Sequence, residues 1–429
     1  MLSLLRIKDR LFYGWVIVIA SLIIGLIIFG TRLSFGVFFK SLEAEFELTR
    51  AVTSGVFSAF SILCCLIAIL GGWALDKYGP RLIASLMGLF TGLSLLLTSQ
   101  TTSHWQLFLS YSLLLSIGIG AAYIVLMATV SRWFDKKRGL ALGIATSGGG
   151  LGVIATAPFS TYLISSLGWR MAYIVMGVIA WLTVISLSRL LKKDPSEIGE
   201  LPDGIRTIPA VTGILGKEGI REGKVLPTGF SFRQALRNRN YWFLAIIWLL
   251  YAFCAFLVLT HIIPHVTDLG IPPMKAAGVL SLIGGFNVIG RLIIGTLSDR
   301  VGRRLAAIVC VAFNVAAMIW LIWAHDLLML YLFAIVYGFT YGGFDACIVA
   351  IVGDIFGMRR LGVIMGTLSV AFSIGAAIGS FFGGLIFDVT GSYNLAFLIG
   401  AAAMLLIILF TTLIRGRSIP RLTRANRAM

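Results

Sequence analysis

The chain has 429 residues, of which 59% are hydrophobic and only 12% are charged, and its mean hydropathy is +0.97. A soluble domain carries roughly 25% charged and 45–50% apolar residues, so this composition excludes a water-soluble globular protein. The formal net charge of +17 could suggest nucleic-acid binding. The basic residues, however, cluster between long apolar runs rather than on one patch, and therefore indicate orientation in a membrane.

Apolar runs long enough to cross a bilayer, which takes about 20 residues, recur along the whole chain. The first run is longer than the apolar core of a signal peptide, and no small-x-small cleavage site follows it, so we interpret it as a retained helix. The runs predict an all-α membrane protein with twelve transmembrane helices at 13–38, 51–75, 81–99, 105–131, 139–164, 169–190, 240–267, 274–298, 304–324, 327–354, 361–386 and 393–414.

The basic residues favour one orientation of these helices. Cytoplasmic loops carry an excess of Lys and Arg, so we expect both termini to be cytoplasmic, in an integral protein of a bacterial cytoplasmic membrane. All but six of the 35 Lys and Arg residues fit this arrangement, the exceptions being Arg32, Lys40, Arg50, Arg170, Lys275 and Arg291.

A change in composition divides the chain into two halves. Residues 191–239 are rich in Pro, Gly and charged residues and predict a cytoplasmic linker. The linker would join an N-terminal six-helix bundle, residues 1–190, to a C-terminal six-helix bundle, residues 240–429. We expect a central cavity between the two bundles.

The two halves contain related sequences. The stretch GGWALDKYGPRL at 71–82 matches IGTLSDRVGRRL at 294–305, and the offset that relates Asp76 to Asp299 also relates Gly79 to Gly302. A constant offset predicts parallel six-helix repeats about an axis along the membrane normal.

These repeated stretches resemble the loop between helices 2 and 3 of the major facilitator superfamily, Gly-x-x-x-Asp-(Arg/Lys)-x-Gly-x-(Arg/Lys). The first copy has Pro80 where a basic residue is usual, whereas the second copy fits fully. The resemblance implies the major facilitator fold and alternating access. A carboxylate at a helix end, near basic side chains, can latch two halves in one state; the alternative is a basic loop that only sets topology. The predicted latch residues are Gly72, Asp76, Lys77, Gly79, Arg81, Gly295, Asp299, Arg300, Gly302 and Arg303.

Further stretches resemble the bacterial monocarboxylate porter and oxalate:formate antiporter branch of that superfamily. The resemblance implies a secondary active transporter of a small organic anion, such as lactate or pyruvate, by proton symport. The alternative is an exporter of drugs or other organic solutes by proton antiport. The stretches are YGWVIV at 13–18, RLSFGVFFKSL at 32–42, SRWFDKKRGLALGIATSGGGLG at 131–152, GWRMAY at 168–173 and NVIGRLIIGTLSDR at 287–300.

Arg291 is the strongest candidate for a substrate-binding residue. It lies near the middle of the eighth predicted helix, where a lipid-facing guanidinium would be costly, and its planar donors match a carboxylate bidentately. Asn287, one turn away, can donate a further hydrogen bond. The resemblance implies that Arg291 is the carboxylate anchor, and that coupling through the aspartate that mammalian porters have at the position of Asn287 is absent. The alternative is a structural arginine that bridges helices or snorkels.

Other polar residues within the spans extend the candidate site. Tyr341 and Asp345 lie on one face of the tenth helix, and Asp345 must pair with a basic group, carry a proton or be neutral. Histidine titrates near physiological pH, although His261, like Asp268, could simply be a polar residue near the outer mouth. Arg32 could face the cavity or snorkel. The predicted substrate-binding residues are Arg291, Asn287, Tyr123, Tyr341, His261 and Arg32, and the proton-coupling candidates are Asp345, Asp268 and His261.

The remaining features indicate neither an enzyme nor a metalloprotein. No Ser/His/Asp set, metal cluster or nucleotide loop is present, so we expect no cofactor, and a monomer whose partners are lipid, a small organic anion and protons. The cysteines, Cys64, Cys65, Cys254, Cys310 and Cys347, lie inside apolar runs and are predicted to be buried and reduced. Four-residue spacing predicts close helix packing at Gly139, Gly143, Gly375, Gly379 and Gly383.

Overall fold

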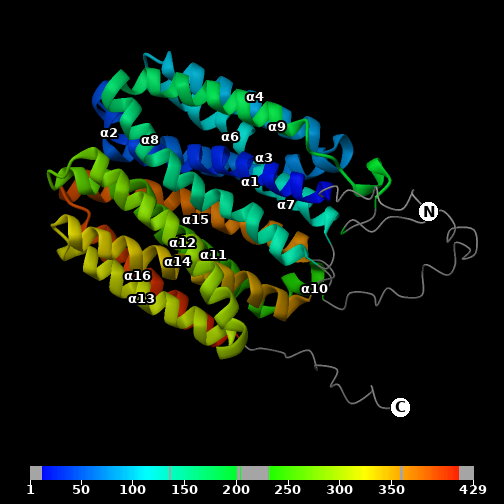
Figure 1. The fold of residues 1–429 in the computed structure, drawn as a ribbon. Helices are drawn as coiled ribbons and strands as arrows, with labels where there is room; N and C mark the ends of the chain where they lie inside the picture. The colour runs from blue at the N-terminus through cyan, green and yellow to red at the C-terminus, as the bar shows by residue number, and fades with distance from the viewer. Residues whose placement is uncertain are drawn as a thin grey trace, which may run out of the picture. The chain divides into compact units, whose positions relative to one another are not determined.

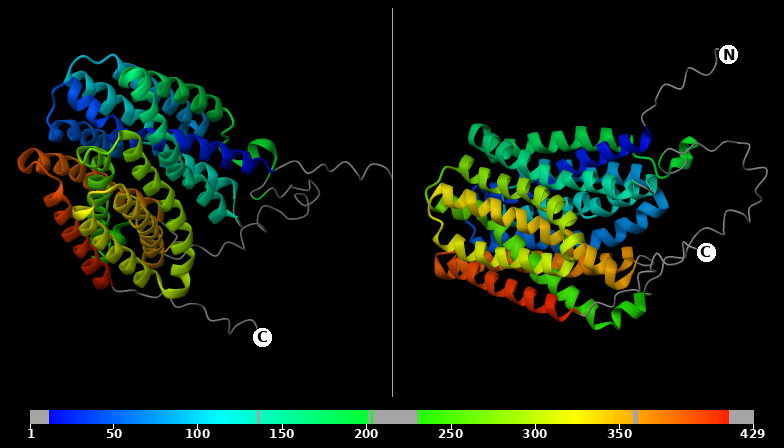
Figure 2. Two further views of the ribbon diagram at one scale, coloured as in Figure 1. Left: turned by 60° about the vertical axis from the view of Figure 1, so that its left-hand side comes forward. Right: turned by 60° about the horizontal axis from the view of Figure 1, so that its bottom comes forward.

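The computed structural model describes residues 12–134, 137–200, 203, 230, 232–357 and 361–414. Nearly all of these residues are helical, and within each part of the chain the long helices run side by side (Figures 1 and 2). Helices suit such apolar segments because every backbone polar group in lipid must be satisfied within its own segment. Most of the linker predicted at 191–239 lies outside the described residues.

The first six predicted spans correspond to a series of helices, some of which contain π-helical turns. They are α1 (Tyr13–Leu33), α2 (Phe35–Glu45), α3 (Arg50–Tyr78), α4 (Pro80–Ser99), α5 (His104–Leu107), η1 (Phe108–Leu114), α6 (Leu115–Ile119), α7 (Ala122–Trp133), α8 (Arg138–Ala180), η2 (Trp181–Ile185) and α9 (Ser186–Ser188).

The last six predicted spans correspond to six long helices. Two short helices, η3 (Pro195–Ile198) and α10 (Phe232–Leu236), come before them in the chain. The long helices are α11 (Arg239–Asp268), α12 (Pro273–Val301), α13 (Arg303–Trp323), α14 (Leu327–Phe356), α15 (Leu361–Thr390) and α16 (Asn394–Leu413).

Eleven helical segments of the described residues are long and apolar enough to cross a membrane, and one of them is long enough to cross it two times. The segment Arg138–Ser188 has 51 residues, which at 1.5 Å per residue would extend about 76 Å, more than twice the hydrocarbon thickness of a bilayer. Gly168, with φ 82° and ψ 161°, interrupts it. A non-glycine residue would be strained there. The twelve predicted spans are therefore confirmed.

Contacts divide the chain into two compact units. Unit 1 contains Met1–Leu48 and Ala59–Lys224, and unit 2 contains Thr49–Ser58 and Val225–Met429. The start of α3 thus packs with unit 2, although the rest of the same helix belongs to unit 1. The domain boundaries predicted at residues 190 and 240 remain a prediction.

Unit 2 contains two helix pairs whose backbones touch at glycines. On α15, a Cβ atom at Gly375 or Gly379 would overlap a backbone carbonyl of α11, and one at Gly383 would overlap the His261 ring. The predicted close packing at these three glycines is confirmed. Gly139 and Gly143 differ: no atom of the described residues lies within 4 Å of a Cβ atom there, so the prediction of close packing at those two positions is wrong. The helical spacing of small residues does not reveal whether another helix covers that face.

The second pair of touching helices is α12 and α14. A Cβ atom at Gly290 would overlap the carbonyl of Phe339, and a Cβ atom at Gly342 would overlap the carbonyl of Asn287. Small residues on both helices let the two backbones approach closely, as helix pairs in lipid commonly do. This approach positions the charged residues that follow each glycine.

Candidate functional site

An ion pair joins α12 to α14 within unit 2. Arg291 Nη2 lies 2.5 Å from Asp345 Oδ2, and the two side chains retain 34% and 25% of their exposure. Arg291 follows the close-approach glycine Gly290, and Asp345 lies one turn after Gly342, so the tight helix contact brings the charges together. Of the alternatives for Asp345, pairing with a basic group is the one this structure contains.

Stacked aromatic rings lie beside this pair. The Tyr341 ring stacks on Tyr337, with centroids 5.9 Å apart, and on Tyr251 of α11, with centroids 5.2 Å apart. The Tyr251 hydroxyl donates a 3.0 Å hydrogen bond to the Tyr341 carbonyl and lies within electrostatic range of Arg291 and Asp345. Tyr251 was not predicted, because its role depends on a contact between helices distant in sequence.

Two buried N–H donors near this level have no acceptor among the described residues. They are Nδ2 of Asn287 and the indole Nε1 of Trp248, whose side chain is only 8% exposed. A buried donor without a partner carries a desolvation penalty of about 1–3 kcal/mol. An oxygen-bearing ligand that accepts from these groups would remove that penalty.

The helix ends indicate that Trp248 lies at about the level of the Arg291–Asp345 pair in unit 2. The Tyr241 ring at the start of α11 contacts Phe356 at the end of α14, so these two helix ends lie together. Trp248 is about 14 Å from the start of α11, and Asp345, the partner of Arg291, is about 16 Å from the end of α14, at 1.5 Å per residue. The Phe372 ring of α15 contacts both Trp248 and Tyr251, with centroids 5.8 Å and 6.5 Å away.

Two predicted site residues belong to unit 1. Tyr123 lies on α7 with 55% of its surface exposed. The Arg32 guanidinium, in the last turn of α1, lies 5.7 Å from the centroid of the Phe60 ring. Their membership of one binding site with Arg291 remains a prediction.

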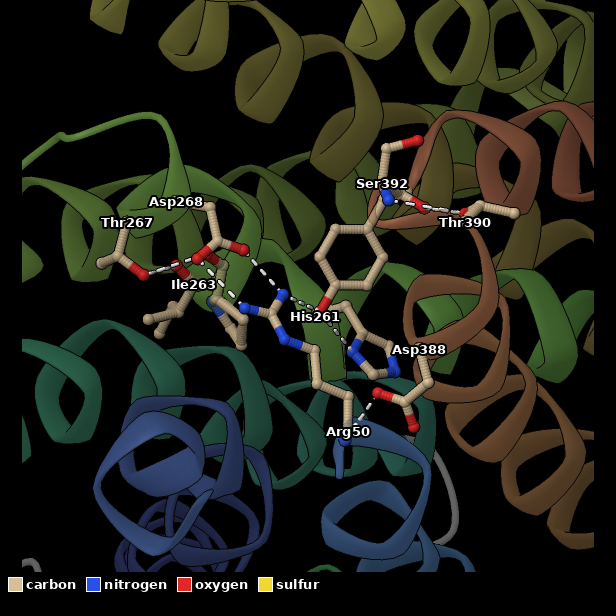
Figure 3. A network of polar contacts seen from close by, with 10 residues as sticks. Arg50, His261, Ile263, Thr267, Asp268, Asp388, Thr390 and Ser392 are labelled. Carbon is tan, nitrogen blue, oxygen red and sulfur yellow. Dashed lines mark hydrogen bonds and ion pairs between the residues drawn. The ribbon is translucent and has the colours of Figure 1, made fainter. Parts of the chain in front are cut away.

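The other predicted residues, Asp268 and His261, join one polar network in unit 2 (Figure 3). Both carboxylate oxygens of Asp268 accept from the Arg50 guanidinium, at 2.6 Å and 3.0 Å. His261 is fully buried, and its Nε2 lies 2.8 Å from the Ser380 carbonyl, which can only accept, so this nitrogen carries the proton. Nδ1 then accepts from the Tyr393 hydroxyl at 3.3 Å. Arg50 was not predicted as a site residue, although it is one of the six basic residues outside the charge pattern.

The repeated loops also contain ion pairs, each within its own unit. Asp76 pairs with Arg132 at 2.9 Å in unit 1, and Gly79 has a φ of 80°. Asp299 pairs with Arg303 at 2.9 Å in unit 2, where Gly302 has a φ of 104°. Arg303 also contacts Asp354 at 2.6 Å. The other predicted latch residues, Gly72, Lys77, Arg81, Gly295 and Arg300, lie on the helices beside these turns.

Replacing either loop aspartate with asparagine is expected to slow transport more than it weakens substrate binding. Both aspartates hold helix ends in one arrangement, so their loss changes a conformational equilibrium rather than a ligand contact. Initial uptake rates and binding affinities of Asp76→Asn and Asp299→Asn, measured on the same preparations, check this. Unchanged uptake rates in both variants would contradict the latch.

The described residues contain no group of three or more His, Cys, Asp or Glu side chains that could hold a metal ion. All five cysteines are free thiols; Cys64, Cys254, Cys310 and Cys347 are buried, as predicted, and Cys65 is half-buried.

Comparisons with known proteins point to a transporter fold. The family description Major Facilitator Superfamily matches residues 20–325 and 286–428. The chain is 28% identical over 407 residues to Monocarboxylate transporter 13 of Bos taurus, covering 92% of this chain and 87% of the relative. It is 22% identical over 351 residues to the Uncharacterized MFS-type transporter YhjX of Escherichia coli, covering 81% and 82%.

A solved structure shares the fold. It is the crystal structure of a bacterial homologue of the human lysosomal transporter Spinster, in an inward-facing and unoccupied conformation. The TM-score is 0.70 at 17% sequence identity, and the match covers 94% of this chain and 95% of that one.

Proposed function

The chain belongs to the Major Facilitator Superfamily, and on that premise we propose that it carries a small monocarboxylate, such as lactate or pyruvate, together with a proton. It is an integral membrane transporter and not an enzyme. The name of its relative Monocarboxylate transporter 13 supports an anionic substrate. We also place both termini in the cytoplasm, on the charge pattern.

The Arg291–Asp345 pair carries the proposal. While Asp345 is ionised, it neutralises Arg291 and competes with any other anion for the guanidinium. Protonation of Asp345 removes that competitor, and the planar guanidinium of Arg291 can then accept a substrate carboxylate as a bidentate partner. The proton and the substrate together keep the local charge unchanged, which lowers the cost of moving the loaded site through a low-dielectric region.

The donors around the pair support an oxygen-bearing ligand. Asn287 and Trp248 each present a buried N–H group that lacks an acceptor among the described residues. Tyr341 and Phe372 offer aromatic surface for a short carbon chain. A carboxylate with an adjacent oxygen fits this mixture of donors and rings.

The second candidate function is export of an organic cation by proton antiport. Asp345 favours it, because a half-buried carboxylate can hold a cation once Arg291 moves away. The two functions differ in the sign of the substrate's charge and in the direction in which the proton moves.

Uptake of a labelled monocarboxylate into proteoliposomes is expected to rise as the external pH falls, because the proton is a co-substrate. In Asp345→Asn the proton site is lost, so the uptake that remains should no longer depend on an imposed pH gradient. Empty liposomes and the Lys275→Gln variant, which changes an exposed basic residue, are the controls. Uptake that is independent of pH in the unmodified protein would contradict proton symport, and proton-driven accumulation of an organic cation would favour the exporter.

A further inference from the structure

The helix α3 is divided between the two compact units. Its residues up to Ser58 pack with unit 2, and from Ala59 onward it belongs to unit 1. α3 is nevertheless one continuous helix from Arg50 to Tyr78. Any movement of one unit relative to the other must therefore bend α3 or release its first turns from unit 2.

The side chain of Arg50 makes the strongest of the contacts that hold these turns. Its guanidinium donates to both oxygens of Asp268, at 2.6 Å and 3.0 Å, and to the Tyr393 hydroxyl at 2.7 Å. Its Cζ atom also lies 3.5 Å from the centroid of the Phe387 ring, a cation–π contact. Arg50 is only 7% exposed, so its charge depends on these partners rather than on water.

A second carboxylate holds the backbone at the same point. The two oxygens of Asp388 accept from the backbone N–H groups of Arg50 and Ala51, at 2.9 Å and 2.8 Å. The first N–H groups of a helix have no partner within the helix, and a negative charge near them is favourable. Asp388 on α15 therefore caps α3 from unit 2 (Figure 3).

The next turns of α3 make weaker contacts with unit 2. Ser58 Oγ donates to the Ala377 carbonyl at 2.7 Å, and Ser54 Oγ lies 3.5 Å from His261 Nε2. Gly384 of α15 leaves no room for a Cβ atom beside the Arg50 carbonyl, so the two backbones touch. The charged contacts are thus concentrated at the very start of α3.

The contacts lie at one end of unit 2. Asp268 is the last residue of α11, Asp388 lies near the last residue of α15, and Tyr393 directly precedes α16. The Asp299–Arg303 pair lies at the far end of α12, the helix that begins just after Asp268. Unit 2 therefore has one set of ion pairs at each end of its helices.

We propose that Arg50, Asp268, Asp388 and Tyr393 form a clasp that holds the start of α3 on unit 2 and must open for substrate to pass that end of the helices. This inference rests on the proposed transport function. The clasp favours the conformation in which it is closed, and opening replaces its ion pairs by water, which is accessible at a helix end but not in mid-membrane.

A reporter cysteine tests the clasp without any substrate. In a variant whose five native cysteines are replaced by serine or alanine, Ser54→Cys places a thiol at a buried position beneath the clasp. Adding Arg50→Gln or Asp268→Asn is expected to raise the rate of labelling by a maleimide on the order of tenfold or more, because one partner of a buried pair is missing. Arg50→Lys, which keeps the charge but not the planar donors, should lie between.

Two controls separate opening of the clasp from unfolding. The Lys275→Gln change, of an exposed basic residue in the first turn of α12, should leave labelling of the Ser54→Cys reporter unchanged. A reporter at Ser94→Cys, buried in unit 1, should stay protected in every clasp variant. Equal labelling of the Ser54→Cys reporter with and without Arg50 would overturn the clasp even if lactate uptake is intact. Faster labelling in a protein that does not transport monocarboxylates would support the clasp and reject only the proposed substrate.

Discussion

Replacing Arg291 with alanine is expected to abolish saturable uptake of monocarboxylates. The guanidinium is the positive charge of the α12–α14 pair, and without it a bound carboxylate has no compensation for its lost hydration. Arg291→Lys keeps the charge but loses the planar pair of donors, so we expect partial uptake with weaker apparent affinity. Uptake of labelled lactate and pyruvate by proteoliposomes that contain equal amounts of each variant measures both effects.

A double variant serves as the control that separates loss of the binding charge from damage to the fold. The double variant Arg291→Ala, Asp345→Ala removes both charges and tests whether an unpaired Asp345, rather than the missing arginine, causes the loss. We expect it to be as inactive as Arg291→Ala, with an unchanged melting temperature. If Arg291→Ala transports monocarboxylates at the normal rate, the carboxylate proposal is wrong and the exporter takes its place.

Replacing Gly342 with leucine is expected to prevent α12 and α14 from packing. A Cβ atom alone would overlap the Asn287 carbonyl, and backbone atoms cannot move aside as a side chain can. Overpacking usually costs about 1–3 kcal/mol, and a backbone clash exceeds that range because the helices must separate. We expect little monodisperse protein in detergent, a lower melting temperature and no uptake.

Gly353 provides the control on the same helix. In the part of the chain that the structure describes, no atom lies within 4 Å of a Cβ atom at this position. Gly353→Ala should therefore leave recovery and uptake unchanged, and alanine favours the helix more than glycine does. A Gly342→Leu variant with the same melting temperature as Gly353→Ala would show that the close approach of α12 and α14 does not hold unit 2 together.

The helices could be predicted from the sequence because hydrophobicity and length determine a membrane span almost alone. The runs at 139–164 and 169–190 were predicted to be separate spans, and the structure divides them at Gly168, whose φ of 82° and ψ of 161° are not helical. The close packing predicted at Gly139 and Gly143, in contrast, is wrong. A pattern along one helix does not say which neighbour covers it, and none of the described residues comes within 4 Å of a Cβ atom at either position.

The candidate site was less accessible to prediction. A guanidinium in mid-span is conspicuous in a sequence, so Arg291 could be identified, whereas its partner depended on which helix packs against α12. The pairing with Asp345 joins residues more than fifty positions apart. Arg50 was visible only as an exception to the charge pattern, and its partners come from α11, α15 and the turn before α16.

The pairing of α11 with α15 has a consequence for biosynthesis. About 90 residues separate Asp268 from Leu361, and ribosomes add roughly 5–20 residues per second, so α11 enters the bilayer many seconds before its partner exists. During that interval, lipid chains cover the carbonyls of Leu249 and Phe253, which Gly375 and Gly379 later contact. Those lipids must leave before α15 can dock, so unit 2 becomes compact only near the end of translation.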